Sequence, residues 1–330
     1  MQKIHFICLL FAAFLLSECK KEKAANSDIN LVGSWQQATN NKKTPSYLIF
    51  KSDKTLDVLN TDDRNLRYIQ QGYYSTSGGQ IILSLSGTEQ LMNMSQSGDS
   101  LFLTSNDPSR NLVLLKDNLA PKTTESYISP VAVLDRFEDT AKATHLTYYA
   151  NKLYGIINFP STLFTYDLSL KKITAATTLS TSYSGITALS DGSLWTVYGN
   201  TLVKINFSGT VLFTSAANPG SYGRGLTYDG EYLYSVLSDR LSGYNINSNA
   251  FEDNIYLSYD IEEIAAAKGY IYAVKNGAIS KIEKTTDRAI QSFFVKDYYI
   301  RTLTFDGTYF WASASDNKSD KIEILKLDLN

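Results

Sequence analysis

Histidine and cysteine are scarce in this sequence, and their scarcity excludes several kinds of site. Only two histidines occur in 330 residues, His5 and His145, and the two cysteines are Cys8 and Cys19. A zinc site built from several imidazoles or thiolates is therefore not available. The sequence also lacks a Gly-x-Ser-x-Gly motif, a phosphate-binding loop and a dinucleotide fingerprint. We therefore expect no metal, no cofactor and no catalytic constellation, since a Ser-His-Asp triad could use only His145.

Charge is also sparse, and its two signs are balanced. Lys and Arg number 31 against 33 Asp and Glu, which gives a formal net charge of −2. A chain with this balance has no bulk attraction to nucleic acid, so we expect no nucleic-acid partner. Charged residues make up only 19% of the chain, whereas Tyr alone occurs 23 times. Because aromatic and hydroxyl-bearing residues favour strands, the composition predicts an all-β protein.

Residues 1–19 have the layout of an export signal, with one early Lys, an apolar run from Ile4 to Leu16 and a short polar end. The closing piece "LLSEC" resembles a bacterial lipobox, which implies that Cys19 is lipidated and becomes the mature N-terminus. Cys8 would be removed with the signal, so no disulfide could form in the mature chain. The alternative is an ordinary secretory signal in which Cys19 is incidental.

The polar stretch at residues 20–28 predicts a flexible tether. Its style resembles lipoproteins of the Bacteroidetes. This resemblance implies a cell-envelope protein of the outer membrane, facing the periplasm or the cell surface, with the membrane as a partner through the lipid.

Residues 29–118 alternate between short apolar stretches and turn residues, which predicts strands joined by hairpins. The pattern Gly33-x-Trp35, the hairpin with Phe50 and Asp53, and a late Gly-Asp-x-Leu-x-Leu turn resemble small lipocalin-like domains. The resemblance implies a small antiparallel barrel or half-barrel. In a barrel this short, Trp35 is expected to fill the core, and a contact with a ligand is the alternative.

Residues 119–129 contain Pro and small polar residues, and we interpret them as a linker. Beyond them, five repeats occur at spacings of 38 to 40 residues, each with several short strands. This period is typical of a β-propeller with one blade per repeat. The last repeat ends after its third strand, so residues 130–138 are expected to complete it. Residues 130–330 are thus predicted to form a five-bladed propeller that is closed by its N-terminal strand.

An Asp-Gly turn followed by an aromatic residue recurs in these repeats. We expect the turn to be structural, because Gly adopts positive φ readily and Asp tolerates it. The aromatic residues are expected to fill the wedges between blades. They are Tyr154, Trp195, Tyr234, Tyr272 and Trp311.

The repeats resemble those of glutaminyl cyclotransferase-like propellers. In that family a Glu-Gly pair precedes the first strand, whereas no repeat of this chain has it. The corresponding pairs are Thr144-His145, Ser184-Gly185, Arg224-Gly225, Glu262-Glu263 and Arg301-Thr302. The resemblance therefore implies the fold, and the departure puts the activity in question.

These pairs precede the innermost strands, so their side chains are expected to reach the mouth of the central channel. Arg224, Glu262 and Arg301 come from three successive repeats. Such a group suits a sugar, a peptide or a carboxylate, and a closed Arg-Glu-Arg salt network is the structural alternative. Nearby candidates are Tyr183, Tyr222, Tyr259, Asp260, Tyr298 and Tyr299.

Three functions remain open at this stage. The first is a lipid-anchored protein that is not an enzyme and binds a small ligand or a protein at the channel mouth. The second is a lyase or cyclotransferase that uses Glu262, Glu263 or Asp260 as general acid or base. The third is an assembly scaffold that acts through the sides of the propeller.

Overall fold

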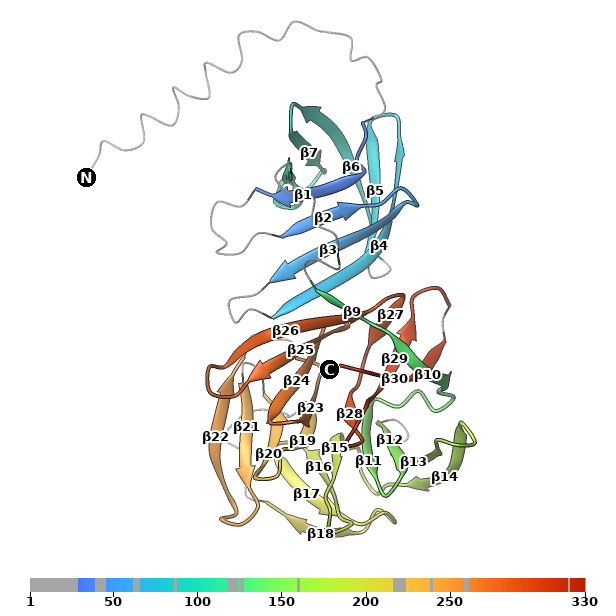
Figure 1. Ribbon diagram of the computed structural model, residues 1–330, viewed down its shortest axis with the longest axis vertical. Helices are drawn as coiled ribbons and strands as arrows, with labels where there is room; N and C mark the ends of the chain where they lie inside the picture. The colour runs from blue at the N-terminus through green and yellow to red at the C-terminus, as the bar shows by residue number, and fades with distance from the viewer. Residues whose placement is uncertain are drawn as a thin grey trace, which may run out of the picture.

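The chain folds into two all-β bodies, a closed barrel and a five-bladed propeller, in a computed structural model (Figure 1). The structure describes residues 29–38, 46–61, 66–85, 88–117, 124, 128–158, 161–215, 224–237, 240–257, 261–319 and 321–329. The predicted signal with Cys19, the tether and most of the predicted linker lie outside the described residues. The predicted fold class, a small barrel followed by a five-bladed propeller, is confirmed.

The barrel is closed by antiparallel pairing of its first and last strands, β1 and β8. Trp35 is 0% exposed within its apolar core, and its Nε1 donates a 2.8 Å hydrogen bond to the carbonyl oxygen of Leu31. The expectation that Trp35 fills the core is therefore confirmed. A short 3-10 helix, η1 (Pro108–Arg110), precedes the last strand. The strands are β1 (Gly33–Gln37), β2 (Tyr47–Phe50), β3 (Thr55–Thr61), β4 (Arg67–Ser77), β5 (Gln80–Leu85), β6 (Thr88–Ser97), β7 (Ser100–Thr104) and β8 (Leu112–Lys116).

The propeller consists of five sheets, and the strands of the first three blades follow the chain in order. Blade 1 contains β11 (His145–Tyr149), β12 (Lys152–Asn158), β13 (Ser161–Asp167) and β14 (Lys172–Thr178). Blade 2 contains β15 (Ser184–Ala188), β16 (Leu194–Tyr198), β17 (Thr201–Ile205) and β18 (Val211–Thr214). Blade 3 contains β19 (Arg224–Tyr228), β20 (Tyr232–Val236), β21 (Arg240–Asn245) and β22 (Ala250–Tyr256).

The last two blades take strands from both ends of the propeller sequence. Blade 4 contains β23 (Glu263–Ala267), β24 (Tyr270–Lys275), β25 (Ala278–Glu283), β26 (Arg288–Val295) and the added strand β9 (Ser129–Val131). Blade 5 contains β27 (Tyr298–Ile300), β28 (Thr304–Phe305), β29 (Phe310–Asp316), β30 (Ile322–Leu327) and β10 (Val133–Glu138).

The segment that closes the ring is two strands, where the sequence predicted one. β10 pairs with β30 and completes blade 5, as predicted. Residues Ser129–Val131 instead pair in parallel with β26 of blade 4. The segment therefore crosses from the outer edge of one blade to the outer edge of the next, and it covers both edges.

Aromatic side chains on the second strand of each blade fill the wedges between blades, as predicted. The ring centroids of Tyr272 and Phe310, from blades 4 and 5, are 4.5 Å apart. Trp195 of blade 2 lies 6.0 Å from Tyr244 of blade 3. Large flat rings bury much area in these contacts, so each blade is held by its neighbours.

The recurring Asp-Gly turns are structural, although the Asp has a different part from the predicted one. Gly230 has φ 104°, as expected, whereas Asp229 is not among the residues with positive φ. The Asp229 carboxylate accepts hydrogen bonds from the backbone N–H groups of Glu231 and Tyr232. The Asp is therefore favoured because its side chain caps the turn.

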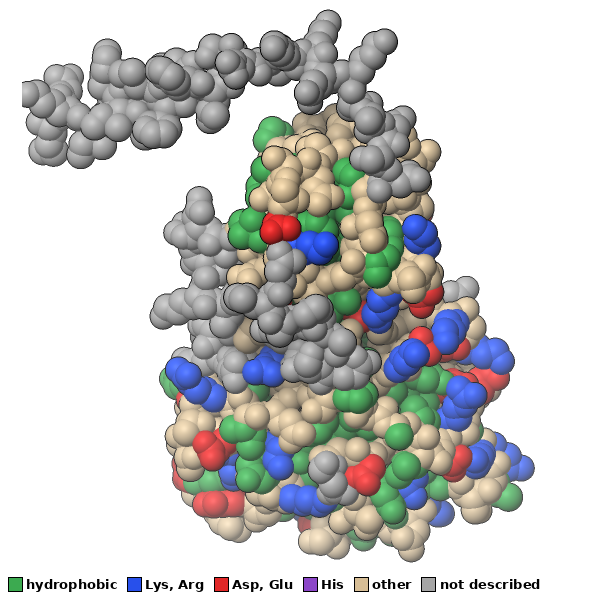
Figure 2. All heavy atoms as spheres, turned by 45° about the horizontal axis from the view of Figure 1, so that its top comes forward, with side chains coloured by type: hydrophobic (Ala, Val, Ile, Leu, Met, Phe, Trp, Pro, Cys, Tyr) green, Lys and Arg blue, Asp and Glu red, His purple; other side chains and the backbone are tan. Residues whose placement is uncertain are grey.

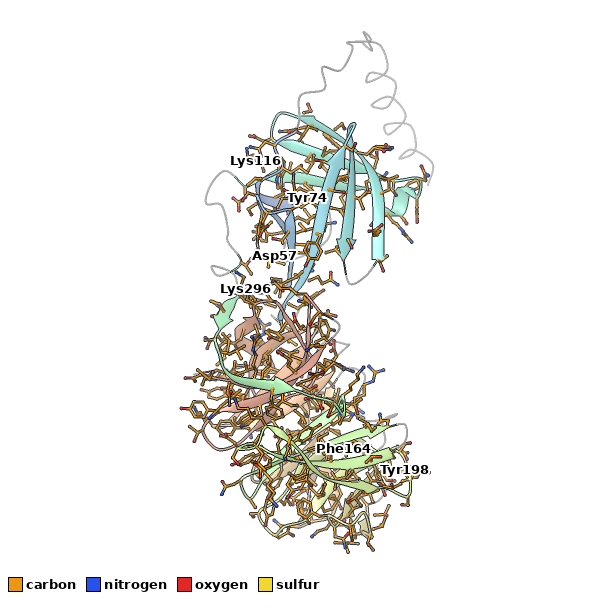
Figure 3. The ribbon with its side chains drawn as sticks, turned by 90° about the vertical axis from the view of Figure 1, so that its right-hand side faces the viewer. Asp57, Tyr74, Lys116, Phe164, Tyr198 and Lys296 are labelled. Atoms are coloured by element: carbon orange, nitrogen blue, oxygen red, sulfur yellow. The ribbon has the colours of Figure 1, made fainter. Side chains whose placement is uncertain are left out.

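The barrel sits on the propeller over blade 4, and it also reaches blades 3 and 5 (Figures 1 and 3). Leu66, just before β4, is 0% exposed and belongs to an apolar cluster of blades 3 and 4 that includes Ile255 and Ile264. Ile69 and Leu59 of the barrel share a second apolar cluster with Phe294 of blade 4. The two bodies are thus joined by buried apolar contacts. Figure 2 shows that charged side chains are more frequent on the propeller than on the barrel in that view.

Asp139 lies in the turn between β10 and β11 and ties blade 5 to blade 1. It is 1% exposed, and its carboxylate accepts hydrogen bonds from the backbone N–H groups of Ala141, Lys142 and Ala143. It also accepts a 2.8 Å bond from the hydroxyl of Tyr166 in blade 1. The ring junction therefore depends on one buried carboxylate.

We expect Asp139→Ala to lower the free energy of unfolding by about 3 kcal/mol or more, because several donors lose their shared acceptor together. Tyr166→Phe removes one of these bonds and should cost about 1 kcal/mol. Urea unfolding of both variants measures the difference. Equal stability of the two variants would contradict this account of the junction.

Candidate active site at the channel mouth

The innermost strands of the five blades, β11, β15, β19, β23 and β28, contact one another in a ring around the central channel. The pairs identified in the sequence precede or begin these strands, so they gather at one end of the channel. The β24–β25 turn lies at the same end, because the start of β23 pairs with the end of β24. The barrel approaches this end over blade 4.

Glu263 and His145 form a buried pair across the channel. His145 Nδ1 lies 2.6 Å from Glu263 Oε2, and the two residues are 8% and 2% exposed. They begin β11 of blade 1 and β23 of blade 4, which are not neighbours in the ring. The pair therefore spans the centre of the propeller.

Gly225 of blade 3 makes room for this pair. Its φ is +50°, and a Cβ at this position would lie 2.4 Å from Glu263 Oε1. The contact between His145 and Glu263 was not predicted from the sequence, where the two residues were candidates for separate roles. The signal was present, because the two residues hold equivalent places at the start of the innermost strand in their repeats.

Glu262 faces blade 5, away from its neighbour Glu263, as strand alternation requires. Its Oε1 accepts a 2.7 Å hydrogen bond from the Tyr299 hydroxyl and a 3.0 Å bond from the backbone N–H of Asn276. Burial raises the pKa of Glu262, although both hydrogen bonds and the charges of Arg224 and Arg301 oppose this shift. Burial and the bond to Glu262 also raise the pKa of Tyr299.

Arg224 and Arg301 lie close enough to Glu262 to lower its pKa by their charge, so the structure gathers the three predicted residues. Within the described residues, however, neither guanidinium forms an ion pair with Glu262 or with another carboxylate. The alternative of a closed Arg-Glu-Arg network is therefore not seen here, because Glu262 is turned toward Tyr299. Two cationic groups are left beside a half-buried carboxylate.

The other predicted residues divide into three groups. Tyr298 lies away from Glu262, because its hydroxyl donates to Glu323 and accepts from Arg136 at the outer part of blade 5. Tyr183 precedes β15 and is 2% exposed in an apolar cluster, so its ring is packed in the propeller core. Tyr222, Tyr259 and Asp260 lie outside the described residues.

Two further searches of the described residues bear on the class of site. No group of three or more His, Cys, Asp or Glu side chains in that part of the chain is arranged to hold a metal ion. No helix among the same residues is long and apolar enough to cross a membrane.

Solved structures with a similar fold match the chain. The glutaminyl cyclase of Myxococcus xanthus aligns with a TM-score of 0.51 and 13% identity, over 60% of this chain and 96% of that one. The propeller has a glutaminyl cyclase fold. A weaker match is hydrazine synthase of Kuenenia stuttgartiensis, with a TM-score of 0.38, 12% identity and coverage of 54% and 57%. No protein-family model and no curated protein matches the chain.

The predicted similarity to the glutaminyl cyclase propellers thus holds for the fold. At this level of identity the likeness concerns the fold alone, and the missing Glu-Gly pairs are consistent with that restriction. The propeller corresponds to almost the whole length of the cyclase, so the barrel is an addition to the shared body.

We expect Glu263→Ala to lower the free energy of unfolding by about 3 kcal/mol, because it leaves His145 buried without its partner. The double variant His145→Ala/Glu263→Ala should lose less than the sum of the single variants, since the two sites are coupled. Exposed Glu231→Ala is the matched control, with a change within about 0.5 kcal/mol. Additive losses in urea unfolding would contradict a direct pair.

Glu262 should make the protein less stable as the pH rises. Its folded pKa is raised above the usual 4.5, so the unfolded chain loses this proton first. The free energy of unfolding therefore falls from about pH 4.5 up to the folded pKa and then levels. Glu262→Gln should lack this fall and gain on the wild type across the same range. Parallel stability curves from urea unfolding at several pH values would count against the raised pKa.

Proposed function

We propose that the protein binds a small anionic ligand at the channel mouth, between Arg224 and Arg301. The observation that carries this proposal is the pair of guanidinium groups that lack a carboxylate partner among the described residues. Guanidinium groups bind carboxylates and phosphates through paired N–H donors. Glu262 between them would accept a hydroxyl or amino proton of the same ligand, and so select ligands that carry a donor beside the anionic group.

The test is calorimetric titration with succinate, glucuronate and inorganic phosphate at low and high salt. We expect at least one of them to bind, with Arg224→Gln and Arg301→Gln each weakening binding about tenfold, or about 1.4 kcal/mol. Salt should weaken it further, because the site is open to solvent. Arg288→Gln, an exposed arginine on β26, is the matched control. Equal affinity in all three variants, or no binding at all, would overturn the proposal.

We also propose that the protein is held at the cell envelope by a lipid on Cys19. The support comes from the export-signal layout, the "LLSEC" piece and the polar stretch that follows it. Within this proposal the outer membrane is a partner through the anchor.

Cys19→Ser should release the mature protein into the soluble fraction or leave it unprocessed. Fractionation followed by mass spectrometry of the N-terminal peptide measures this. An unacylated wild-type chain with its N-terminus at another residue would favour the ordinary secretory signal.

A second function, catalysis by Glu262, is favoured by one specific observation. Burial raises the pKa of the Glu262 carboxyl, and a raised pKa brings a carboxyl closer to the range in which it can act as a general acid. The similar fold of a glutaminyl cyclase suggests a substrate to try, a peptide with an N-terminal glutamine. If this function holds, the wild type releases ammonia from such a peptide, Glu262→Gln does not, and Arg288→Gln retains the activity. Absence of ammonia release with the wild type would leave binding or a scaffold role.

A further inference from the structure

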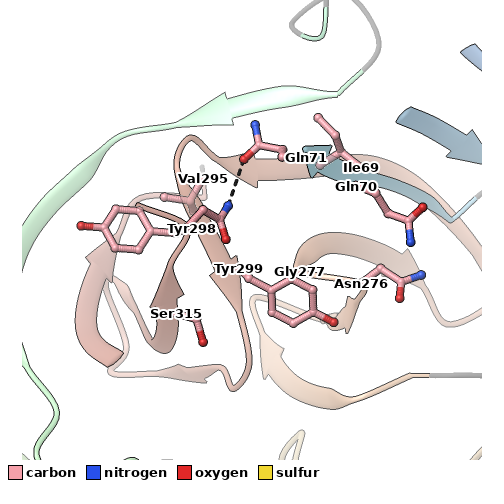
Figure 4. A pocket seen from close by; sticks show the side chains of 10 residues that line it. Ile69, Gln70, Gln71, Asn276, Gly277, Val295, Tyr298, Tyr299 and Ser315 are labelled. Carbon is pink, nitrogen blue, oxygen red and sulfur yellow. Dashed lines mark hydrogen bonds between the residues drawn. The ribbon is translucent and has the colours of Figure 1, made fainter. Parts of the chain in front are cut away.

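A cavity of about 390 Å³ lies between the barrel and the propeller, next to the channel mouth (Figure 4). This interdomain cavity is lined from the barrel side by Ile69, Gln70 and Gln71 of β4, and from the propeller side by blades 4 and 5. Its volume falls within the range of about 300–1,000 Å³ that small-molecule sites occupy. Neither body encloses this space alone.

Among the described residues, no charged side chain lines the interdomain cavity. Three side-chain amides line it together with Gln71, from Gln70, Asn276 and Asn317. Asn317 Nδ2 donates a 3.2 Å hydrogen bond to Gln71 Oε1 and so joins the two bodies. The amides of Gln70 and Asn276 make no side-chain hydrogen bond with any described residue. Each therefore offers both a donor and an acceptor to a ligand.

An aromatic ring in a fixed position faces the same space. Tyr299 packs over Gly277, where an added Cβ would lie 2.8 Å from the ring atom Cδ2. Asn276 and Gly277 form the two-residue turn between β24 and β25 with φ values of 48° and 74°. This is the turn geometry that an Asn-Gly pair favours. The hydroxyl of Tyr299 is held by Glu262, so both ends of the ring are constrained.

We propose that the interdomain cavity binds a neutral sugar. A pyranose carries hydroxyl groups on its edges and C–H groups on its faces, and it has no charge to neutralise. The free amides match the hydroxyl groups, while the Tyr299 ring and the apolar side chains of Ile69 and Val295 match the faces. An anion is disfavoured here by the uncharged lining, which separates this site from the cationic mouth.

The barrel would then be a component of the binding site. Gln70 and Gln71 come from β4, whose preceding residue Leu66 is buried in the apolar cluster of blades 3 and 4 and fixes the approach of the strand. A ligand that bonds to Gln70 and Asn276 bridges the two bodies. It should therefore raise the apparent stability of the whole chain, since it binds only the docked arrangement.

The experiment is saturation-transfer NMR and calorimetry on the chain from residue 20 onward, which contains both bodies. The probes are glucose, galactose, mannose, N-acetylglucosamine, cellobiose and maltose. At least one should bind saturably, and Gln70→Ala and Asn276→Gly should each weaken it about five- to tenfold. Asn276→Gly keeps the turn while removing the amide, because Gly accepts the same positive φ.

Two matched variants locate the site. Gln291→Ala, an exposed amide on β26, should leave the sugar affinity within about twofold, whereas Arg301→Gln tests whether the sugar lies at the mouth instead. Loss of sugar binding in Arg301→Gln with none in Gln70→Ala would place the ligand at the mouth and overturn the proposal. Absence of saturable binding for all six sugars would overturn it as well. Neither result depends on whether anions bind between the arginines.

Discussion

Closure of the ring is the constraint on which the rest of this structure depends. A propeller whose last blade ended at β30 would present an unpaired edge, and the first and last blades would be joined by side-chain packing alone. The pairing of β10 with β30 removes that edge. Because β10 is reached from the barrel through β9 on β26, the same segment also brings the barrel to blade 4. The same segment of chain therefore both closes the ring and positions the barrel.

Closure of the ring also determines which polar side chains at the channel end are paired. With blade 1 held beside blade 5, His145 reaches across to Glu263, and both polar side chains are buried together. Such burial is tolerable because each member is the hydrogen-bond partner of the other. Arg224 and Arg301 have no such partner among the described residues. Arg224 is exposed and Arg301 is partly exposed. The buried pair of His145 and Glu263 thus links two blades, whereas the more exposed Arg224 and Arg301 can face a ligand.

Features that recur with the repeat can be predicted from the sequence. Contacts that depend on how distant strands are placed relative to one another cannot. The period near 40 residues, Trp35 in the barrel core and Tyr272 in its wedge follow from spacing and side-chain size. The pairing of β9 with β26 depends on the path of the chain between two blades, which spacing does not encode. The hydrogen bond between Tyr299 and Glu262 depends on how the Tyr299 ring packs on Gly277, which spacing does not encode either.

The interdomain cavity could not be predicted from the sequence, because its two walls are separated by about two hundred residues. The composition shows that Tyr and amide residues are abundant, but it does not say which of them meet in space. A cavity becomes predictable only when the docking of the barrel is known. That docking rests on Leu66 and Ile69, which in the sequence look like any other apolar strand residues.

Tyr299 connects the two places where a ligand is proposed. Its ring lines the interdomain cavity, while its hydroxyl donates the hydrogen bond that opposes the raised pKa of Glu262. The ring is held at one end by packing on Gly277 and at the other by its bond to Glu262. A sugar that stacked on this ring would meet a surface that is already in place, so little conformational freedom would be lost on binding.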